Sequence, residues 1–165
     1  MKLAEFNSLD PARAGEVLKP CVDIPRWVEA ITAARPFPSK AALLAFAAKT
    51  SRPFTADEVE AAMAHHPRIG EKPTSGTVEA SMSRSEQSGV DPSDAGVGQA
   101  MAQGNRDYEE KFGRVFLIRA AGRTGAEILA ALNERLTHPS AEEDAIVAGQ
   151  LREIALLRLE GVIAE

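Results

Sequence analysis

The chain has 165 residues, of which 44% are apolar and 26% are charged, and its formal net charge is −5. This length suits one domain with a proper core, and the composition is that of an ordinary globular protein. The negative charge argues against a nucleic-acid partner, because nucleic-acid-binding proteins usually present a basic surface. A single cysteine, Cys21, excludes an intramolecular disulfide and a cysteine-based metal cluster.

The sequence carries neither a membrane signal nor an export signal. No apolar run approaches the ~20 residues that a membrane span needs, and the first residues lack the apolar segment of a secretory signal. We therefore expect a cytoplasmic protein without a membrane partner. Aromatic residues make up only 5% of the chain and alanine is abundant, which favours closely packed helices over a sheet sandwich.

Helix-start signals predict four helices before residue 66. A capping Ser or Asp, an N-terminal Pro, or a Thr followed by Glu three residues later marks each start. The starts are Ser8 or Asp10, Pro25, Ser39 and Thr55. The fourth helix leads into the pair His65-His66, which stands directly before Pro67.

The second half of the chain shows the same kind of pattern. Helices are predicted over 77–88, 97–112, 125–136 and 140–163, with loops over 71–77 and 89–98. Ser140 and Glu143 are expected to form a capping box. The apolar run 115–118 has no partner strand, so we expect it to be buried extended chain. The predicted fold is an all-α, single-domain bundle of about eight helices over residues 1–165.

The stretch around His66 is the first candidate for chemistry. The residue before a proline is biased away from helical geometry, so the helix should stop there, and Gly70 permits the chain to turn. Histidine can exchange protons near neutral pH. The alternative role is structural, with the imidazole capping the last carbonyls of the helix.

Two further features can contribute polar groups to a site. Ser83 and Glu86 lie three residues apart on one helix face, with Gln87 beside them. That helix is either a solvated surface or the wall of a pocket. Arg158, flanked by leucines in the last predicted helix, either extends from an apolar face to solvent or clamps a carboxylate.

These residues resemble the signature of a known family. The sequence His66-Pro67-Arg68-Ile69-Gly70, followed by Ser83-x-x-Glu86-Gln87, is similar to that of 2-oxo-4-hydroxy-4-carboxy-5-ureidoimidazoline (OHCU) decarboxylases. The stretches 108–113, 116–118 and 158–159 also resemble their counterparts, in the family's order. One departure is that Arg-Ile-Gly-Glu follows His-Pro, where family members often have Asp-Leu-Ala-Gly.

The resemblance implies an all-α enzyme of urate degradation that needs no cofactor or metal and is commonly a homodimer. Its reaction would decarboxylate a small ureidoimidazoline to (S)-allantoin and CO₂. His66 would be the general acid/base and Glu86 the group that orients it. Arg158 would bind anionic or carbonyl oxygens, and Ser83 and Gln87 would fix the N–H groups of the ligand. Further contacts would come from Pro67 and the backbone of Ile118.

Two alternatives remain open on the sequence alone. The first is a metal hydrolase that uses His65, His66 and Glu71, although adjacent histidines on a helix point about 100° apart and suit a shared metal poorly. The second is a non-enzymatic helical interaction module that docks through the polar helix over 77–88.

Overall fold

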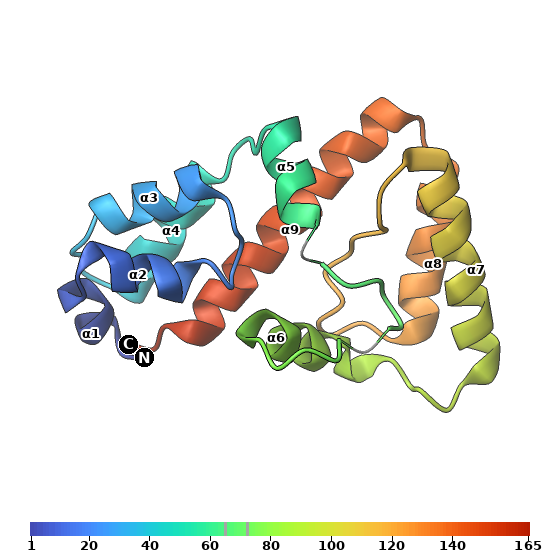
Figure 1. The fold of residues 1–165 in the computed structure, drawn as a ribbon, viewed down its shortest axis with the longest axis horizontal. Helices are drawn as coiled ribbons and strands as arrows, with labels where there is room; N and C mark the ends of the chain where they lie inside the picture. Colours follow the sequence, from blue (N-terminus) through green and yellow to red (C-terminus); the bar gives the residue numbers. More distant parts are fainter. Residues whose placement is uncertain (65, 72) are drawn as a thin grey trace. The chain divides into compact units, whose positions relative to one another are not determined.

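The computed structural model describes residues 1–64, 66–71 and 73–165. As predicted, the fold is all-α: the described residues form nine α-helices and one 3₁₀ turn, and their only β-type pairing is a bridge between Lys2 and Ala164 (Figure 1). No helix within these ranges is long and apolar enough to cross a membrane. The chain divides into two compact units, Met1–Ala62 with Leu151–Glu165, and Met63–Gln150. A single domain over 1–165 stays a prediction.

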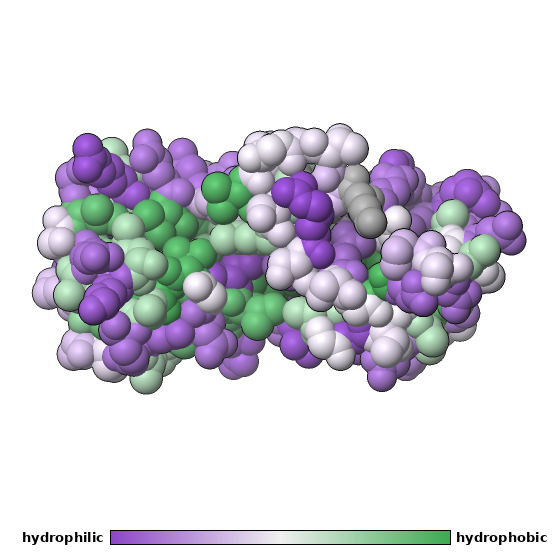
Figure 2. Space-filling model, turned by 90° about the horizontal axis from the view of Figure 1, so that it is seen from below, coloured by the Kyte–Doolittle hydropathy of each residue, from purple (hydrophilic) through white to green (hydrophobic). Residues whose placement is uncertain are grey.

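The first unit is built from short helices around an apolar core. Trp27, Leu43 and Leu159 are fully buried there, and the indole Nε1 of Trp27 donates to the carbonyl of Ala47 at 3.1 Å. Figure 2 shows apolar side chains also reaching the surface of this unit, at the left. Its helices are α1 (Leu3–Ser8), α2 (Pro11–Leu18), α3 (Pro25–Ala33), α4 (Lys40–Thr50), α5 (Ala56–Met63, which ends in the second unit) and the end of α9 (Ser140–Val162).

The second unit packs two longer helices against extended chain. It holds α6 (Val78–Glu86), the 3₁₀ turn η1 (Gln87–Gly89), α7 (Ala95–Phe112), α8 (Gly125–Arg135) and the start of α9. Helices α7 and α8 lie side by side (Figure 1). A Cβ added to Gly104 would lie 2.5 Å from a methyl group of Leu132, so glycine permits this close packing.

Most of the predicted helix starts are confirmed. Asp10 accepts hydrogen bonds from the first turn of α2, Ser39 caps α4, and Thr55 forms the expected capping box with Glu58. Gly113 ends α7 with a left-handed backbone. The run 115–118 is extended chain, as predicted.

Three details differ from the prediction. Helix α1 was not anticipated. Helix α7 starts at Ala95 rather than at residue 97, because Asp94 caps it by accepting a hydrogen bond from the amide of Val97 at 3.0 Å. Ser140 is the first residue of α9, and Glu143 does not act as a cap but takes part in a buried polar network.

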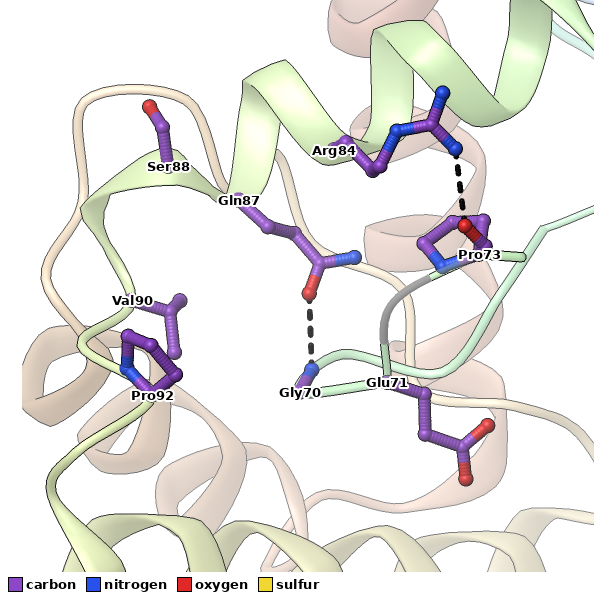
Figure 3. A pocket seen from close by; sticks show the side chains of 8 residues that line it. All are labelled: Gly70, Glu71, Pro73, Arg84, Gln87, Ser88, Val90 and Pro92. Atoms are coloured by element: carbon purple, nitrogen blue, oxygen red, sulfur yellow. Dashed lines mark hydrogen bonds between the residues drawn. The ribbon is translucent and has the colours of Figure 1, made fainter. Parts of the chain in front are cut away.

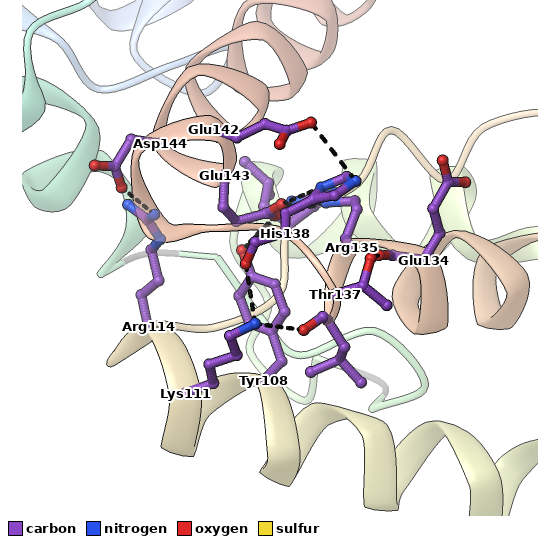
Figure 4. Close-up of polar contacts among 12 residues, drawn as sticks. Tyr108, Lys111, Arg114, Glu134, Arg135, Thr137, His138, Glu142, Glu143 and Asp144 are labelled. Atoms are coloured by element: carbon purple, nitrogen blue, oxygen red, sulfur yellow. Dashed lines mark hydrogen bonds and ion pairs between the residues drawn. The ribbon is translucent and has the colours of Figure 1, made fainter.

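Glu143 is the centre of that network and is completely buried (Figure 4). Its carboxylate accepts from the hydroxyl of Tyr108 and from Nε of Arg135, each at 2.6 Å, and forms an ion pair with the guanidinium of Arg135. Nδ1 of His138 lies 3.2 Å from its other oxygen. Arg135 also donates to the carbonyl of Leu117 at 2.6 Å. The network therefore joins α7, α8, α9 and the extended run.

Burial and hydrogen bonding shift the pKa of Glu143 in opposite directions and that of Tyr108 in the same direction. Burial alone would raise the pKa of Glu143, but hydrogen bonds from Arg135 and Tyr108 outweigh it and hold that pKa below its usual range. Burial, together with the hydrogen bond to Glu143, raises the pKa of Tyr108 to about 12. The carboxylate is therefore ionised and the phenol neutral near neutral pH.

Replacing Glu143 with glutamine should destabilise the protein strongly. Glu143→Gln leaves the guanidinium of Arg135 buried without its counter-ion, a change that typically costs about 3–5 kcal/mol. The measurement is the free energy of unfolding in urea. The matched control is Glu142→Gln, whose side chain is 55% exposed and whose loss should stay within about 0.5 kcal/mol. Equal losses in the two variants would contradict the role given to Glu143.

The difference in stability between wild type and Glu143→Gln should depend on pH, in a direction that the pKa of Glu143 determines. Because the pKa of Glu143 is lowered on folding, its stabilisation is fully present above the ordinary carboxyl pKa of ~4.3. It is lost as the pH falls through the lowered value of the folded state. The stability difference between wild type and Glu143→Gln should therefore shrink on acidification, and a difference that stays constant would contradict this account.

Candidate functional site

His66 lies three residues after the end of α5. The helix ends at Met63, and the backbone N–H of His66 donates to the Met63 carbonyl at 3.1 Å. Both His66 and Pro67 are half-buried. The predicted end of the helix before the proline is confirmed. His65, a ligand in the metal-hydrolase alternative, lies outside the described residues.

The chain turns at Arg68–Glu71. The N–H of Glu71 donates to the carbonyl of Arg68 at 3.2 Å, and Gly70 has a φ of 88°. A positive φ at the third residue is the mark of a type II turn and favours glycine there. The side chain of Ile69 is buried in the apolar cluster of the second unit, so the turn is anchored by its own apolar residue.

Helix α7 holds the turn through two polar contacts. Arg68 makes a two-point contact with Glu109, at 2.5 and 3.1 Å. This contact holds the pKa of Glu109 below its usual range. Asn105, itself buried, donates from Nδ2 to the carbonyl of Ile69 at 2.9 Å. The guanidinium of Arg68 is therefore already paired with a carboxylate.

The polar helix α6 leads into the turn η1, which contacts the turn at Arg68–Glu71. Thr77 caps α6, and Ser83 is one of only two residues that the helix buries. Glu86 and Gln87 are half-buried. Oε1 of Gln87 accepts from the backbone N–H of Gly70 at 2.9 Å (Figure 3). This part of the chain is thus linked to the turn that follows His66, which favours a pocket wall over a purely solvated helix.

Two neighbouring cavities share the turn in their walls. The first has a volume of about 340 Å³ and contains Gln87; its lining residues are Gly70, Glu71, Pro73, Arg84, Gln87, Ser88, Val90 and Pro92 (Figure 3). The second, of about 360 Å³, lies against α7 and includes Asn105 and Glu109. In the first cavity, Nη1 of Arg84 donates to the carbonyls of Pro73 and Ser75, at 2.9 and 3.2 Å, and so ties the 73–75 segment to α6.

The extended run that contains Ile118 is held from both sides. The carbonyl of Leu117 accepts from Arg135, and the N–H of Arg119 donates to Oε1 of Gln150 at 2.8 Å. Ile118 is buried and packs in the same apolar cluster as Ile69. A backbone fixed in this way can present its polar groups to a ligand with little loss of conformational freedom.

Arg158 belongs to the first unit. It is only 6% exposed, and Nη1 donates to the carbonyl of Pro20 at 3.1 Å. Burial of the guanidinium contradicts the simple alternative of an arginine that extends to solvent. The other predicted site residues all belong to the second unit, and the meeting of His66, Glu86 and Arg158 in one cavity stays a prediction.

Sequence reasoning missed Asn105. A signal was present, because Asn105 lies on the stripe formed by Met101 and Tyr108 at helical spacing, where a polar residue is out of place. No group of three or more His, Cys, Asp or Glu side chains suited to a metal ion occurs within the described part of the chain.

Comparisons with known proteins agree with this fold. A curated relative, the uric acid degradation bifunctional protein TTL of Arabidopsis thaliana, is 31% identical over 107 residues, which are 63% of this chain and 33% of the relative. The chain thus spans about a third of that relative's length.

Two solved structures are similar. A crystal structure of OHCU decarboxylase in the presence of (S)-allantoin has a TM-score of 0.65 and 27% identity, covering 86% of this chain and 92% of that one. A crystal structure of (S)-allantoin synthase has a TM-score of 0.70 over 99% of this chain and 54% of that one. Its identity of 18% supports the fold alone.

The family comparison covers nearly the whole chain. The pattern described as OHCU decarboxylase matches residues 7–160, and this family consists of decarboxylases, which are lyases. The interaction module without enzymatic activity is therefore not retained. With the match extending over both units, the chain belongs to the OHCU decarboxylase family.

Proposed function

We propose that this protein decarboxylates 2-oxo-4-hydroxy-4-carboxy-5-ureidoimidazoline to (S)-allantoin and CO₂ in urate degradation. The observation that carries the proposal is the family match over residues 7–160. It is supported by the link between the two motif segments, in which Gln87 accepts a hydrogen bond from Gly70, four residues after His66.

The reaction needs groups that stabilise negative charge and move a proton. When the bond to the carboxyl carbon breaks, CO₂ leaves and an electron pair remains on the ring carbon. The neighbouring C=N group delocalises that pair, and the carbon that becomes the stereocentre then receives a proton. His66 acts as the general acid/base for these transfers. Hydrogen-bond donors already in place stabilise the developing charge.

The remaining residues hold the substrate and the imidazole. Glu86 orients the His66 ring, and Arg158 binds an anionic or carbonyl oxygen of the substrate. Ser83, Pro67 and the backbone of Ile118 complete the contacts. Because the chain carries a net charge of −5, an anionic substrate depends on a locally placed cation, for which the buried guanidinium of Arg158 is suited.

The orientation of the Gln87 amide defines what it contacts. A backbone N–H can only donate, so the group that faces Gly70 must be Oε1, and the NH₂ group forms the other edge of the amide, toward the cavity (Figure 3). We therefore propose that Gln87 donates to a carbonyl or carboxylate oxygen of the substrate. This differs from the expectation that it accepts from ligand N–H groups.

The protein is further proposed to act as a homodimer in the cytoplasm, without a cofactor. The family resemblance supports the homodimer and the lack of a cofactor, whereas the location is supported by the sequence, in which no apolar run approaches the length of a membrane span.

Freshly prepared substrate should become optically active when this protein is added. The spontaneous reaction gives racemic allantoin, whereas proton delivery in a fixed pose produces one enantiomer. Circular dichroism of the reaction mixture follows the (S) product directly. Racemic allantoin formed at the uncatalysed rate in the presence of the protein would refute the proposed function.

Replacing His66 with asparagine should remove most of the activity while leaving the fold intact. General acid–base groups typically contribute about 10²–10⁴-fold, so turnover should fall by this factor in the same assay. The control is His138→Asn, which alters the buried network in Figure 4 and should lower stability but not the turnover of folded protein. Full turnover of His66→Asn would end the assignment of His66.

Replacing Gln87 with glutamate tests the direction of its hydrogen bond. The variant keeps the oxygen that accepts from Gly70, but it places a second oxygen where the NH₂ group was. Binding of (S)-allantoin, measured by calorimetry, should weaken by about tenfold or more, because an oxygen of the glutamate would face an oxygen of the ligand where the NH₂ group had donated a hydrogen bond. The control for the added charge is Gln99→Glu at an exposed site on α7. Unchanged or tighter binding by Gln87→Glu would show that Gln87 accepts from the ligand.

A further inference from the structure

One peptide group, the link between Ile69 and Gly70, is held at both of its polar atoms. Its carbonyl oxygen accepts from Nδ2 of Asn105 on α7, at 2.9 Å. Its N–H donates to Oε1 of Gln87 on η1, also at 2.9 Å. The peptide therefore connects an amide on one helix with an amide on another segment.

This peptide is the central one of the turn that begins at Arg68. Type I and type II turns differ by a rotation of the central peptide through roughly 180°, which exchanges the directions of its C=O and N–H groups. The positive φ of Gly70 corresponds to the type II form. A donor on the carbonyl side and an acceptor on the N–H side stabilise this form against the alternative.

Asn105 is unusual in its position. It is 5% exposed, and within the described part of the chain its Oδ1 has no hydrogen-bond partner. A buried acceptor without a partner costs free energy, so an apolar residue would suit packing alone at this position better. What the asparagine contributes is its donor, which reaches the carbonyl of Ile69.

The turn has other anchors. The side chain of Ile69 packs in the apolar cluster, and Arg68 makes its two-point contact with Glu109. These contacts fix the place of the turn, but neither of them fixes the orientation of the central peptide. That orientation decides whether Gln87 meets an N–H or a C=O group, and hence which edge of its amide faces the cavity.

We propose that Asn105 is a positioning residue that acts through the Ile69–Gly70 peptide to hold the Gln87 amide with its NH₂ edge toward the cavity. This inference rests on the proposed function, in which Gln87 contacts the substrate. Without the Asn105 donor, the peptide can rotate and offer its carbonyl to Gln87. The NH₂ group would then be used inside the protein and be lost to the substrate.

A double-mutant cycle tests this connection. Asn105→Leu, which removes the donor and replaces it with an apolar side chain of similar size, should lower kcat/KM by about tenfold, within the range of coupled neighbours. In a Gln87→Ala background the same change should have less than about a threefold further effect, because the group through which it acts is gone. Asn133→Leu on the exposed face of α8 is the matched control. If Asn105→Leu lowers kcat/KM by the same factor with and without Gln87→Ala, the two residues act independently and the proposal is wrong.

A second measurement, made first on the wild-type protein, depends neither on activity nor on the stability of a variant. In the wild-type protein, amide hydrogen exchange at Gly70 should be slowed by about tenfold or more, since its N–H is bonded to Gln87. In Asn105→Leu, if it folds, exchange at Gly70 should become faster and the side-chain amide signals of Gln87 should shift. Unprotected exchange at Gly70 in the wild type would refute the inference. Absence of wild-type turnover, with Gly70 protected, would instead refute the proposed function.

Discussion

The buried ion pair between Arg135 and Glu143 is the interaction on which the second unit depends. Glu143 is completely buried and Arg135 nearly so, and neither charge would be tolerated there alone. The pair uses its remaining hydrogen-bonding capacity on groups from other segments, namely the hydroxyl of Tyr108 and the carbonyl of Leu117. A packing arrangement that separated these segments would leave a charge without a partner, so the network specifies one arrangement of α7, α8, the start of α9 and the extended run.

Helix α7 connects this buried network to the candidate site. Tyr108 ties one turn of the helix to the ion pair, while Asn105, three residues earlier, and Glu109, one residue later, hold the turn after His66. The buried core and the candidate site are thus attached to the same stretch of one helix. Rigid elements of this kind place a functional group more accurately than a loop held only at its ends.

In each hydrogen bond of the turn, the backbone group decides which partner donates and which accepts. A backbone N–H donates and a backbone carbonyl accepts, so the single peptide between Ile69 and Gly70 dictates the direction of the amides that contact it. In the proposed reaction, negative charge develops on the substrate, and a donor edge of Gln87 together with the guanidinium of Arg158 suits that charge. On this proposal, these two groups allow a chain with a negative net charge to bind an anionic substrate.

The sequence by itself determined the helical fold class, most helix boundaries and the family. Caps such as Ser39 and Thr55 and the stop at Gly113 act within a few residues, so their effect is independent of the rest of the fold. The family motif could be recognised because its short stretches follow one another in a fixed order along the chain. The tertiary structure alone decided that Glu143 pairs with Arg135 instead of capping its helix, and that Asn105 reaches the carbonyl of Ile69. Those partners are 8 and 36 residues apart in the sequence, and a side chain that has both local and distant partners available is assigned to one of them only when the core packs and removes water from around it.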